Sequence, residues 1–281
     1  MTHIDRPDLT LLYAPADRPQ LVAKAFATAA DAVIVDLEDA VAPDRKASAR
    51  DALADLVEGH DDRHVQVRIN ALGTPWAARD LDAITALPSN VGVRIPKVTS
   101  PADVLHVAAA VGPRALHLLV ESAAGVEAAY DVARAHPQVA SLGLGEADLR
   151  SDLGIDDDAG LTFARSRVVN AARAAGLPSP SMSVYPNLLD DDGLARSCAV
   201  GRQLGFVGRA AIHPRQLAVI AAAFAPSPLE VEHARRVVEA VHDAREAGSG
   251  TLVLPDGTFL DVAMVERARR MIALADWIAH P

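Results

Sequence analysis

The sequence predicts an α/β fold, a (β/α)8 TIM barrel with a C-terminal helical extension, and three observations lead to this prediction. Short runs rich in Val, Ile and Leu alternate along the chain with Ala-rich amphipathic stretches, as in βαβ units around a parallel sheet. Eight such runs can be counted, and most are continuously apolar, as in strands covered on both faces. No G-x-G-x-x-G motif follows the first run, which favours the closed barrel over an open dinucleotide-binding sheet.

The predicted strands are short and separated by helix signals. They are residues 9–14, 32–37, 64–69, 91–95, 115–120, 139–144, 181–185 and 209–212. Ser100 before Pro101 is typical of a helix start, and Gly112 before Pro113 is typical of a helix end. We therefore assign residues 1–225 to the barrel.

The chain continues beyond the last predicted strand into a segment that a barrel does not require. Residues 229–246 predict a helix, residues 251–260 predict a hairpin after a Gly-rich turn, and the remaining residues predict a final helix. We assign residues 226–281 to a C-terminal extension.

The composition excludes several classes of protein. Half of the 281 residues are hydrophobic, so the chain can bury a sizeable core. A net charge of -10 argues against non-specific binding to nucleic acid. The single cysteine, Cys198, cannot form an internal disulfide, and no apolar run approaches the ~20 residues of a membrane helix. We therefore predict a cytoplasmic protein.

Polar residues stand where the apolar runs stop, which is where catalytic groups lie in a barrel of this kind. In chain order they are Asp36, Glu38, Asp39, Arg68, Asn70, Arg94, Lys97, Glu121, Ser122, Glu146, Asp148, Tyr185, Asn187 and His213. An unpaired charge after a buried strand would cost several kcal/mol, so these charges should face one another or a bound ion. Hard oxygen donors without cysteine indicate Mg²⁺ or Mn²⁺ rather than zinc.

Several of these residues belong to motifs whose order along the chain resembles a known family. The motifs are APADRP at 14–19, DLED at 36–39, VRIN at 67–70, PK at 96–97, VESA at 120–123, GEADL at 145–149 and IHP at 212–214. Together they resemble the HpcH/HpaI aldolase and citrate lyase family. The resemblance is greatest to its CitE-like branch, which contains citrate lyase beta subunits, malyl-CoA lyases and citramalyl-CoA lyases.

The resemblance implies roles for individual residues. Glu121 and Asp148 would hold Mg²⁺, and Arg68 would act in catalysis by binding the substrate's carboxylate or carbonyl oxygen. A structural ion pair between Arg68 and Asp36 or Glu38 is the alternative, and it is compatible with a substrate role. We expect the substrate to be bound by five charged residues, namely Asp36, Glu38, Arg68, Lys97 and Glu121. For Lys97 an ion pair is favoured over a Schiff base.

Two further predictions concern proton transfer and coenzyme A. The segment GTFLD at 257–261 resembles the family segment whose Asp reaches the neighbouring subunit's site, so Asp261 is the acid/base candidate. An N-cap role for the last helix is its alternative. Coenzyme A is anionic and requires local cations, for which Arg18 and Lys24 are the candidates. Arg45 and Lys46 lie in the same cluster, with solvated helix ends as the alternative for both.

The function that the resemblance implies is that of a Mg²⁺-dependent carbon–carbon lyase. Its substrate would be a 3-hydroxyacyl-CoA such as malyl-CoA, citramalyl-CoA or a citryl thioester, cleaved to acetyl-CoA or a homologue and a 2-oxo acid. An aldolase acting on free 4-hydroxy-2-oxo acids and a non-catalytic citrate lyase-like subunit are the alternatives. The family also implies a homotrimer.

Overall fold

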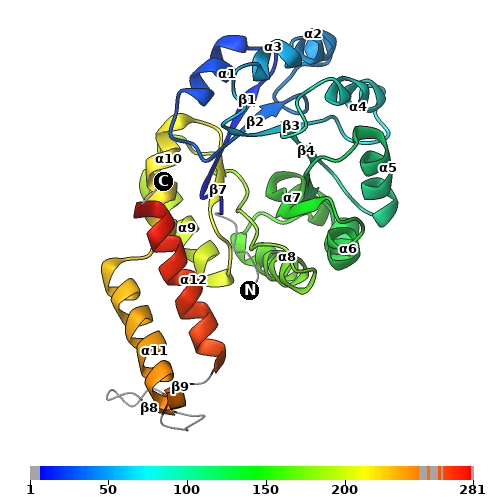
Figure 1. Ribbon diagram of the computed structural model, residues 1–281. Coiled ribbons are helices and arrows are strands. Elements are labelled where there is room, and N and C mark those ends of the chain that lie inside the picture. Colours follow the sequence, from blue (N-terminus) through cyan, green and yellow to red (C-terminus); the bar gives the residue numbers. More distant parts are fainter. Residues whose placement is uncertain (1–6, 247–251, 254–258, 261, 280–281) are drawn as a thin grey trace. The chain divides into compact units, whose positions relative to one another are not determined.

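The computed structural model describes residues 7–246, 252–253, 259–260 and 262–279 (Figure 1). The chain divides into two compact units, Asp8–Ala223 and a C-terminal unit that begins at Phe224. The first unit contains a parallel sheet with its connecting helices. The second contains two long helices and a short hairpin.

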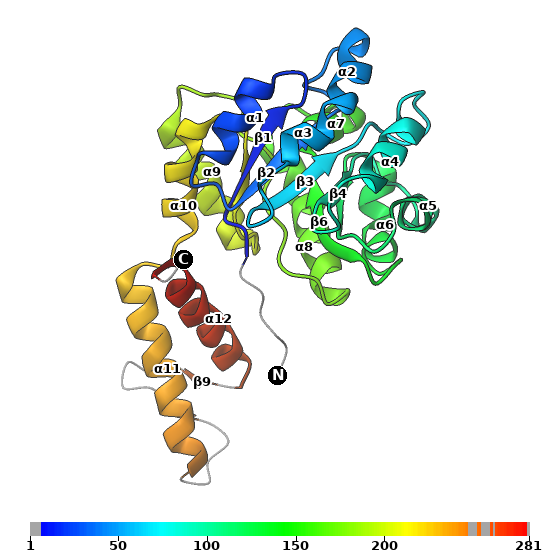
Figure 2. The same cartoon turned by 45° about the horizontal axis from the view of Figure 1, so that its top comes forward.

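The first unit is built on one sheet of seven strands in the order β6-β5-β4-β3-β2-β1-β7. The strands are β1 Thr10–Pro15, β2 Ala32–Asp36, β3 His64–Arg68, β4 Gly92–Ile95, β5 Leu116–Val120, β6 Val139–Leu144 and β7 Arg209–Ala211. All neighbouring pairs are parallel, and the sheet curls (Figures 1 and 2). The predicted parallel α/β fold is therefore confirmed.

Helices connect the strands and lie on the outside of the curled sheet (Figure 2). They are α1 Pro19–Phe26, α2 Lys46–Asp51, α3 Leu53–Val57, α4 Ala77–Thr85, α5 Pro101–Val111, α6 Ala123–Ala133, α7 Glu146–Leu153, α8 Thr162–Ala174, α9 Asp191–Leu204 and α10 Leu217–Phe224. The predicted start at Ser100 is confirmed, because Ser100 and Asp103 form a reciprocal capping box.

Residues 181–185 do not form the seventh strand that the sequence predicts. The sheet therefore has seven strands among the described residues rather than the expected eight. The segment forms one isolated bridge between Met182 and Arg209. The Met182 N–H donates to the Gly208 carbonyl at 3.0 Å, and the Ala210 N–H donates to the Met182 carbonyl at 3.0 Å. Pro180 and Pro186 flank the segment and lack the N–H groups that a longer ladder requires. The segment therefore lies along β7 without becoming a regular strand.

The face of the sheet that holds the strand-end charges has an apolar part and a polar part. Leu11, Ala32, Ile34 and Ala210 form an apolar cluster from β1, β2 and β7. The polar part comes from β3, β4 and β5, and its buried members are Gln66, Arg94 and His117. Arg94 and His117 are register partners and so share one face. A polar layer is thus built into the sheet beneath the strand ends.

The C-terminal unit consists of α11 Pro228–Glu246, α12 Val262–Ala279 and an antiparallel pair, β8 Leu252–Val253 with β9 Phe259–Leu260. The order of helix, hairpin and helix is the one that the sequence predicts. α11 and α12 pack through an apolar cluster of Ala234, Val237, Val241, Val265 and Ala268. Asp261 lies outside the described residues. In the described part of the chain, no helix has the length and apolar character needed to cross a membrane.

Candidate active site

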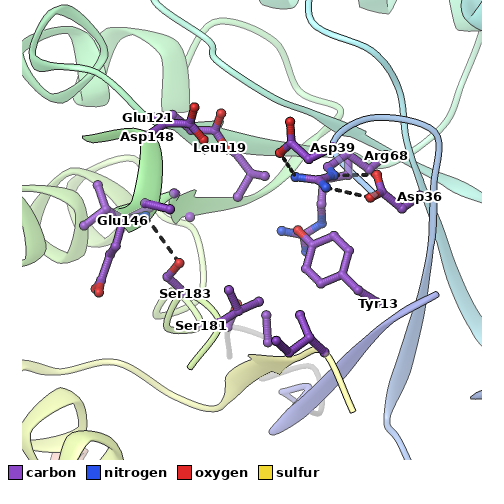
Figure 3. Close-up of a pocket in the computed structure, with 18 of the residues that line it drawn as sticks. Tyr13, Asp36, Asp39, Arg68, Leu119, Glu121, Glu146, Asp148, Ser181 and Ser183 are labelled. Carbon is purple, nitrogen blue, oxygen red and sulfur yellow. Dashed lines mark hydrogen bonds and ion pairs between the residues drawn. The ribbon is translucent and has the colours of Figure 1, made fainter. Parts of the chain in front are cut away.

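A pocket of about 340 Å³ opens at the carboxyl ends of the strands, and most of the charged residues predicted for the site line it (Figure 3). The lining residues used below are Tyr13, Asp36, Arg68, Arg94, Leu119, Glu121, Gly143, Gly145, Asp148, Ser181 and Ser183. Figure 3 shows Glu121 and Asp148 on one wall and Arg68 and Asp36 on the opposite wall. The predicted metal ligands therefore face the predicted substrate-binding arginine across a cavity.

Arg68 is fixed by a bidentate ion pair with Asp36. Its Nε lies 2.6 Å from Asp36 Oδ1 and its Nη2 lies 2.6 Å from Asp36 Oδ2. Asp36 also accepts the backbone N–H groups of Glu38 and Ala40, so the carboxylate itself is held in place. Burial alone would lower the pKa of Arg68, but the bonds to Asp36 reverse this and raise it. The predicted structural ion pair thus exists, and Asp36 is positioned to orient Arg68 toward the pocket.

Glu38 and Lys97 lie beside this pair and link it to the opposite wall. Lys97 Nζ lies 2.8 Å from Glu38 Oε1 and 3.8 Å from Asp148 Oδ1, and Glu38 Oε2 lies 3.1 Å from Arg68 Nη1. Burial raises the pKa of Glu38, while its bonds with the two cations lower it. The backbone of Lys97 adopts a left-handed φ of 54°, which is strained for a residue other than glycine. The ion pairs at Lys97 raise its pKa, so it is protonated and a poor Schiff-base former.

Glu121 is the most perturbed carboxyl group of the site. It follows β5 and is 4% exposed, and its Oε2 has no hydrogen-bond partner among the described residues. Burial raises its pKa to about 8, and the nearby carboxylates of Glu38 and Asp148 add to the effect. A buried carboxyl group with an unsatisfied oxygen is costly unless a partner arrives. The group therefore fits a cation that binds in the pocket.

Asp148 supplies the second carboxylate. It lies in the first turn of α7, and its side chain is 46% exposed. Among the described residues no group of three or more His, Cys, Asp or Glu side chains is arranged to hold a metal. Two carboxylates with open coordination positions suit Mg²⁺, which keeps water and takes substrate oxygens as further ligands.

Gly145 packs against the Glu121 carboxyl group, and its replacement by Ala tests that arrangement. Its φ of -92° suits any residue, so the need for glycine arises from close approach alone. A Cβ at this position would overlap Glu121, lying 2.7 Å from its Cδ. We expect Gly145→Ala to displace the carboxyl group and weaken Mg²⁺ binding about tenfold or more, measured by calorimetry. Ser151→Ala, on the exposed side of α7, is the control, and unchanged affinity in Gly145→Ala would contradict this packing role.

Tyr13 and Ser183 complete the pocket and were not singled out from the sequence. The Tyr13 ring lies against the Arg68 guanidinium, with its centroid 4.9 Å from Cζ. Burial raises the pKa of Tyr13, so the phenol stays neutral. Ser183 Oγ accepts the Glu146 N–H at 3.3 Å. The available signal was a tyrosine within an apolar strand and a serine within the irregular segment, and neither is specific.

A buried network supports the end of β3. Arg50 Nη1 lies 3.1 Å from Asp80 Oδ1. The other oxygen of Asp80 accepts both the backbone N–H of Asn70, at 2.9 Å, and its side-chain amide, at 2.7 Å. This network fixes the backbone two residues beyond Arg68, and the sequence alone did not reveal it because its members come from different helices and loops.

The cations expected to bind coenzyme A lie outside the pocket lining. Arg18, the N-cap residue of α1, and Lys24, in the last turn of α1, are both exposed. Lys46 is buried, and its Nζ donates to the carbonyls of Leu37 and Glu38 at 2.9 Å. Both interpretations of Lys46, as a coenzyme A contact and as a solvated helix end, are therefore wrong. It holds the loop after β2 in place.

Comparison with known proteins identifies the family. The model of the HpcH/HpaI aldolase/citrate lyase family matches residues 9–214, which contain all of these strand ends. The chain belongs to this family. The resemblance seen in the sequence is thus confirmed, and so is the prediction of an enzyme from a family of carbon–carbon lyases.

Relatives of this chain within the family are named as three different enzymes. The chain is 37% identical to a (3S)-malyl-CoA thioesterase of Cereibacter sphaeroides, covering 99% of this chain and 98% of the relative. It is 32% identical to an L-malyl-CoA/beta-methylmalyl-CoA lyase of the same species, covering 98% and 96%. It is 31% identical to citrate lyase subunit beta of Leuconostoc mesenteroides subsp. cremoris, covering 95% and 93%.

Solved structures of the family share the fold. The chain is similar to CitE of Mycobacterium tuberculosis in complex with magnesium, acetoacetate and coenzyme A, with a TM-score of 0.83 and 35% identity over 96% of this chain and 98% of the other. It is also similar to the citrate lyase beta subunit from the same organism complexed with oxaloacetate and magnesium, with a TM-score of 0.69 and 36% identity over 78% and 97%.

Proposed function

We propose that this chain is a Mg²⁺-dependent lyase that cleaves or forms a 3-hydroxyacyl-CoA thioester such as malyl-CoA, citramalyl-CoA or a citryl thioester. The products of cleavage are acetyl-CoA or a homologue and a 2-oxo acid. The observation that carries the proposal is the buried Glu121 carboxyl group, which faces Arg68 across the pocket and has one oxygen without a hydrogen-bond partner in the described part of the chain. Full-length similarity to lyases of CoA thioesters supports the same substrate class.

The residues on the metal side of the pocket fit a divalent cation. Glu121 and Asp148 would hold it, since a cation between them offsets the burial and mutual repulsion that raise the pKa of Glu121. When bound, Mg²⁺ supplies Lewis acidity at the substrate oxygen where charge changes during bond cleavage. The magnesium in the CitE structures supports this choice of cation, and Mn²⁺ is its nearest substitute.

The chain's own residues supply orientation and charge. Cleavage breaks the bond between C2 and C3 of the thioester, the proton leaves the 3-hydroxyl, and the electron pair passes to the thioester's α carbon. Arg68 donates charge-assisted hydrogen bonds to the carboxylate or carbonyl oxygen of the oxo-acid part. Asp36 and Glu38 hold the guanidinium, and Lys97 holds Glu38 beside Asp148. These three residues are proposed to position Arg68 and the metal ligand around the substrate.

The proposal also covers coenzyme A binding, proton transfer and assembly, which involve other parts of the chain. Arg18 and Lys24 would contact the phosphates, and Asp261 would exchange the proton at the α carbon. The C-terminal extension, residues 226–281, would deliver Asp261 to the site of a neighbouring subunit in a trimer. We also propose that the fold is a complete (β/α)8 barrel. Residues 181–185 would occupy the position of its remaining strand.

A complementation experiment tests the shared site. Asp261→Ala chains and Arg68→Ala chains are each expected to be inactive because each lacks one essential group. Mixed oligomers should regain activity, since some sites combine an intact Arg68 with an intact Asp261 from another chain. Activity is measured after denaturation and refolding of the mixture, with mass spectrometry of intact complexes to verify exchange. Verified exchange without recovery would contradict a shared site.

Thioester hydrolysis is the second candidate, because the chain is 37% identical to (3S)-malyl-CoA thioesterases over nearly its whole length. Hydrolysis releases free coenzyme A and a hydroxy acid, whereas cleavage by a lyase releases an acyl-CoA and a 2-oxo acid. The two reactions are distinguished by their products from one substrate. The alternative of an aldolase that needs no coenzyme A predicts release of a 2-oxo acid from a free 4-hydroxy-2-oxo acid.

The deciding experiment is a product analysis with the purified full-length chain. Malyl-CoA, citramalyl-CoA, citryl-CoA and a free 4-hydroxy-2-oxo acid are each incubated with Mg²⁺ or with EDTA. We expect acyl-CoA and 2-oxo acid from at least one thioester, only with Mg²⁺. Free coenzyme A with a hydroxy acid as the only products would favour the thioesterase. Activity on the free acid alone, or on none of these compounds, would overturn the proposal.

A further inference from the structure

Arg94 is a buried cation that lines the pocket. It is 4% exposed, and among the ion pairs of the described residues none includes it. By contrast, Arg68 pairs with Asp36, and Arg165 pairs with Glu146 at 2.8 Å. A buried guanidinium without a counter-charge is costly. The pocket in front of Arg94 is therefore a place where an anion is favoured.

The hydrogen bonds of Arg94 leave part of its donor set unused. Its Nε and Nη2 both donate to a single acceptor, Gln66 Oε1, at 2.9 and 2.6 Å. Nη1 has no hydrogen bond to any described residue, although it can donate two. Arg114, also buried, instead spreads its donors over several backbone carbonyls and does not line the pocket. Arg94 thus keeps free donors together with its charge.

A chain of side chains fixes the direction in which Arg94 points. His64 Nδ1 lies 2.7 Å from Asp8 Oδ2, which assigns the Nδ1 hydrogen to this contact. His64 Nε2 is then the acceptor for Gln66 Nε2 at 3.4 Å. This arrangement turns Gln66 Oε1 toward Arg94. The guanidinium is therefore held by a series of side-chain contacts that begins at Asp8 and ends at the pocket.

Arg68 and Arg94 both contribute positive charge to the part of the pocket that Tyr13 lines. The Arg68 Cζ lies 4.9 Å from the centroid of the Tyr13 ring. Burial raises the pKa of Tyr13, and the charges of both guanidinium groups oppose this effect. The pocket residues that belong to β5 and β6 are Leu119, Gly143 and Leu144, which carry no charge. If the metal and Arg68 bind the carboxylate and carbonyl of a 2-oxo acid, one cation remains for a further anionic group.

We propose that Arg94 binds a second carboxylate on the oxo-acid fragment, so that the enzyme prefers a 2-oxo dicarboxylate to a 2-oxo monocarboxylate. The inference rests on the proposed function and deepens it, because it specifies the substrate class of the same site. Arg94 is in this account a specificity-determining residue. Asp8, His64 and Gln66 are positioning residues that act through it.

Calorimetry with a matched pair of ligands tests the assignment. Oxaloacetate and 2-oxobutyrate have the same carbon chain, and only the first carries a second carboxylate. With Mg²⁺ present, the wild-type chain is expected to bind oxaloacetate at least about tenfold more tightly. Arg94→Met should bring the two dissociation constants close together, while Arg94→Lys should keep part of the preference. Pyruvate is titrated as well, because oxaloacetate slowly loses CO₂ beside Mg²⁺. Arg134→Met, which removes a surface charge, is the control.

The outcomes separate this inference from the proposed function. If no 2-oxo acid binds with Mg²⁺, the proposed function fails. If both ligands bind equally to the wild-type chain, or Arg94→Met keeps the full preference, only the Arg94 assignment is overturned. The titrations are done with and without chloride, and a chloride effect that depends on Arg94 without any oxaloacetate preference would identify an inorganic anion site instead. If Arg94→Met does not fold, equal binding of the two ligands by the wild-type chain still overturns the assignment, and so does a full oxaloacetate preference in Arg94→Lys.

Discussion

Replacing Glu121 by Gln is expected to lower kcat/KM of the Mg²⁺-dependent reaction by about 10³-fold or more. The substitution keeps the shape of the side chain and removes the charge that the cation needs. Asp148, which is half-exposed, would remain as the other protein carboxylate of the proposed pair. Activity is measured over a range of Mg²⁺ concentrations, so that weakened binding and lost chemistry are separated. Glu127→Gln, an exposed change on α6, is the control.

The same substitution has a second expected effect, on stability. The pKa of Glu121 is raised from 4.5 to about 8 in the folded chain, so between these values the folded state holds a proton that the unfolded state has lost. The free energy of unfolding therefore falls as pH rises through this window. Without Mg²⁺ at pH 9, Glu121→Gln is expected to raise Tm by about 3 °C or more. Full activity together with an unchanged Tm would contradict the role given to Glu121.

Replacing Arg68 by Lys is expected to lower kcat/KM by about 10²-fold. An ammonium group keeps the charge but cannot make the two parallel bonds to Asp36 and still present donors to the pocket. The substrate would then bind in a less defined orientation, which affects kcat as well as KM. Steady-state kinetics measures both values. Arg215→Lys, a change in an exposed ion pair with Asp191, is the control.

Comparison with Asp36→Asn separates a substrate role of Arg68 from a purely structural one. If Arg68 only stabilises the fold, both variants should lower Tm and leave kcat per folded molecule unchanged. If Arg68 binds substrate, Arg68→Lys should lower kcat in the fraction that remains folded. A kcat within about twofold of wild type in Arg68→Lys would therefore contradict the proposed role.

The meeting of several predicted charged residues in one pocket was foreseeable because parallel strands place their ends at one edge. Arg68 ends β3, Glu121 follows β5 and Asp148 comes shortly after β6, and the structure brings all three to one pocket. The ion pair of Arg68 with Asp36 was foreseen as an alternative, since both residues end neighbouring strands in register. Strand-end position was therefore a sufficient signal for these four residues.

Other features depended on contacts that sequence periodicity does not encode. Residues 181–185 have the composition of a strand, but their flanking prolines limit the ladder to one bridge. Lys46 was grouped with surface cations, although two backbone carbonyls hold it in a buried position. Gly145 carries no sequence signal for its packing against Glu121. Arg94 was visible as a charge within a buried strand, but only the fold reveals that none of the described carboxylates pairs with it.

The most direct test of the metal site is a calorimetric titration of the wild-type chain with Mg²⁺ at pH 7, in two buffers with different ionisation enthalpies. A carboxyl group with a pKa of about 8 is mostly protonated at this pH and must lose its proton to bind the cation. We predict one Mg²⁺ bound with release of close to one proton, and loss of this binding in Glu121→Gln and Asp148→Asn. Failure of the wild-type chain to bind Mg²⁺, or an affinity in both variants equal to that of the wild-type chain, would contradict the account.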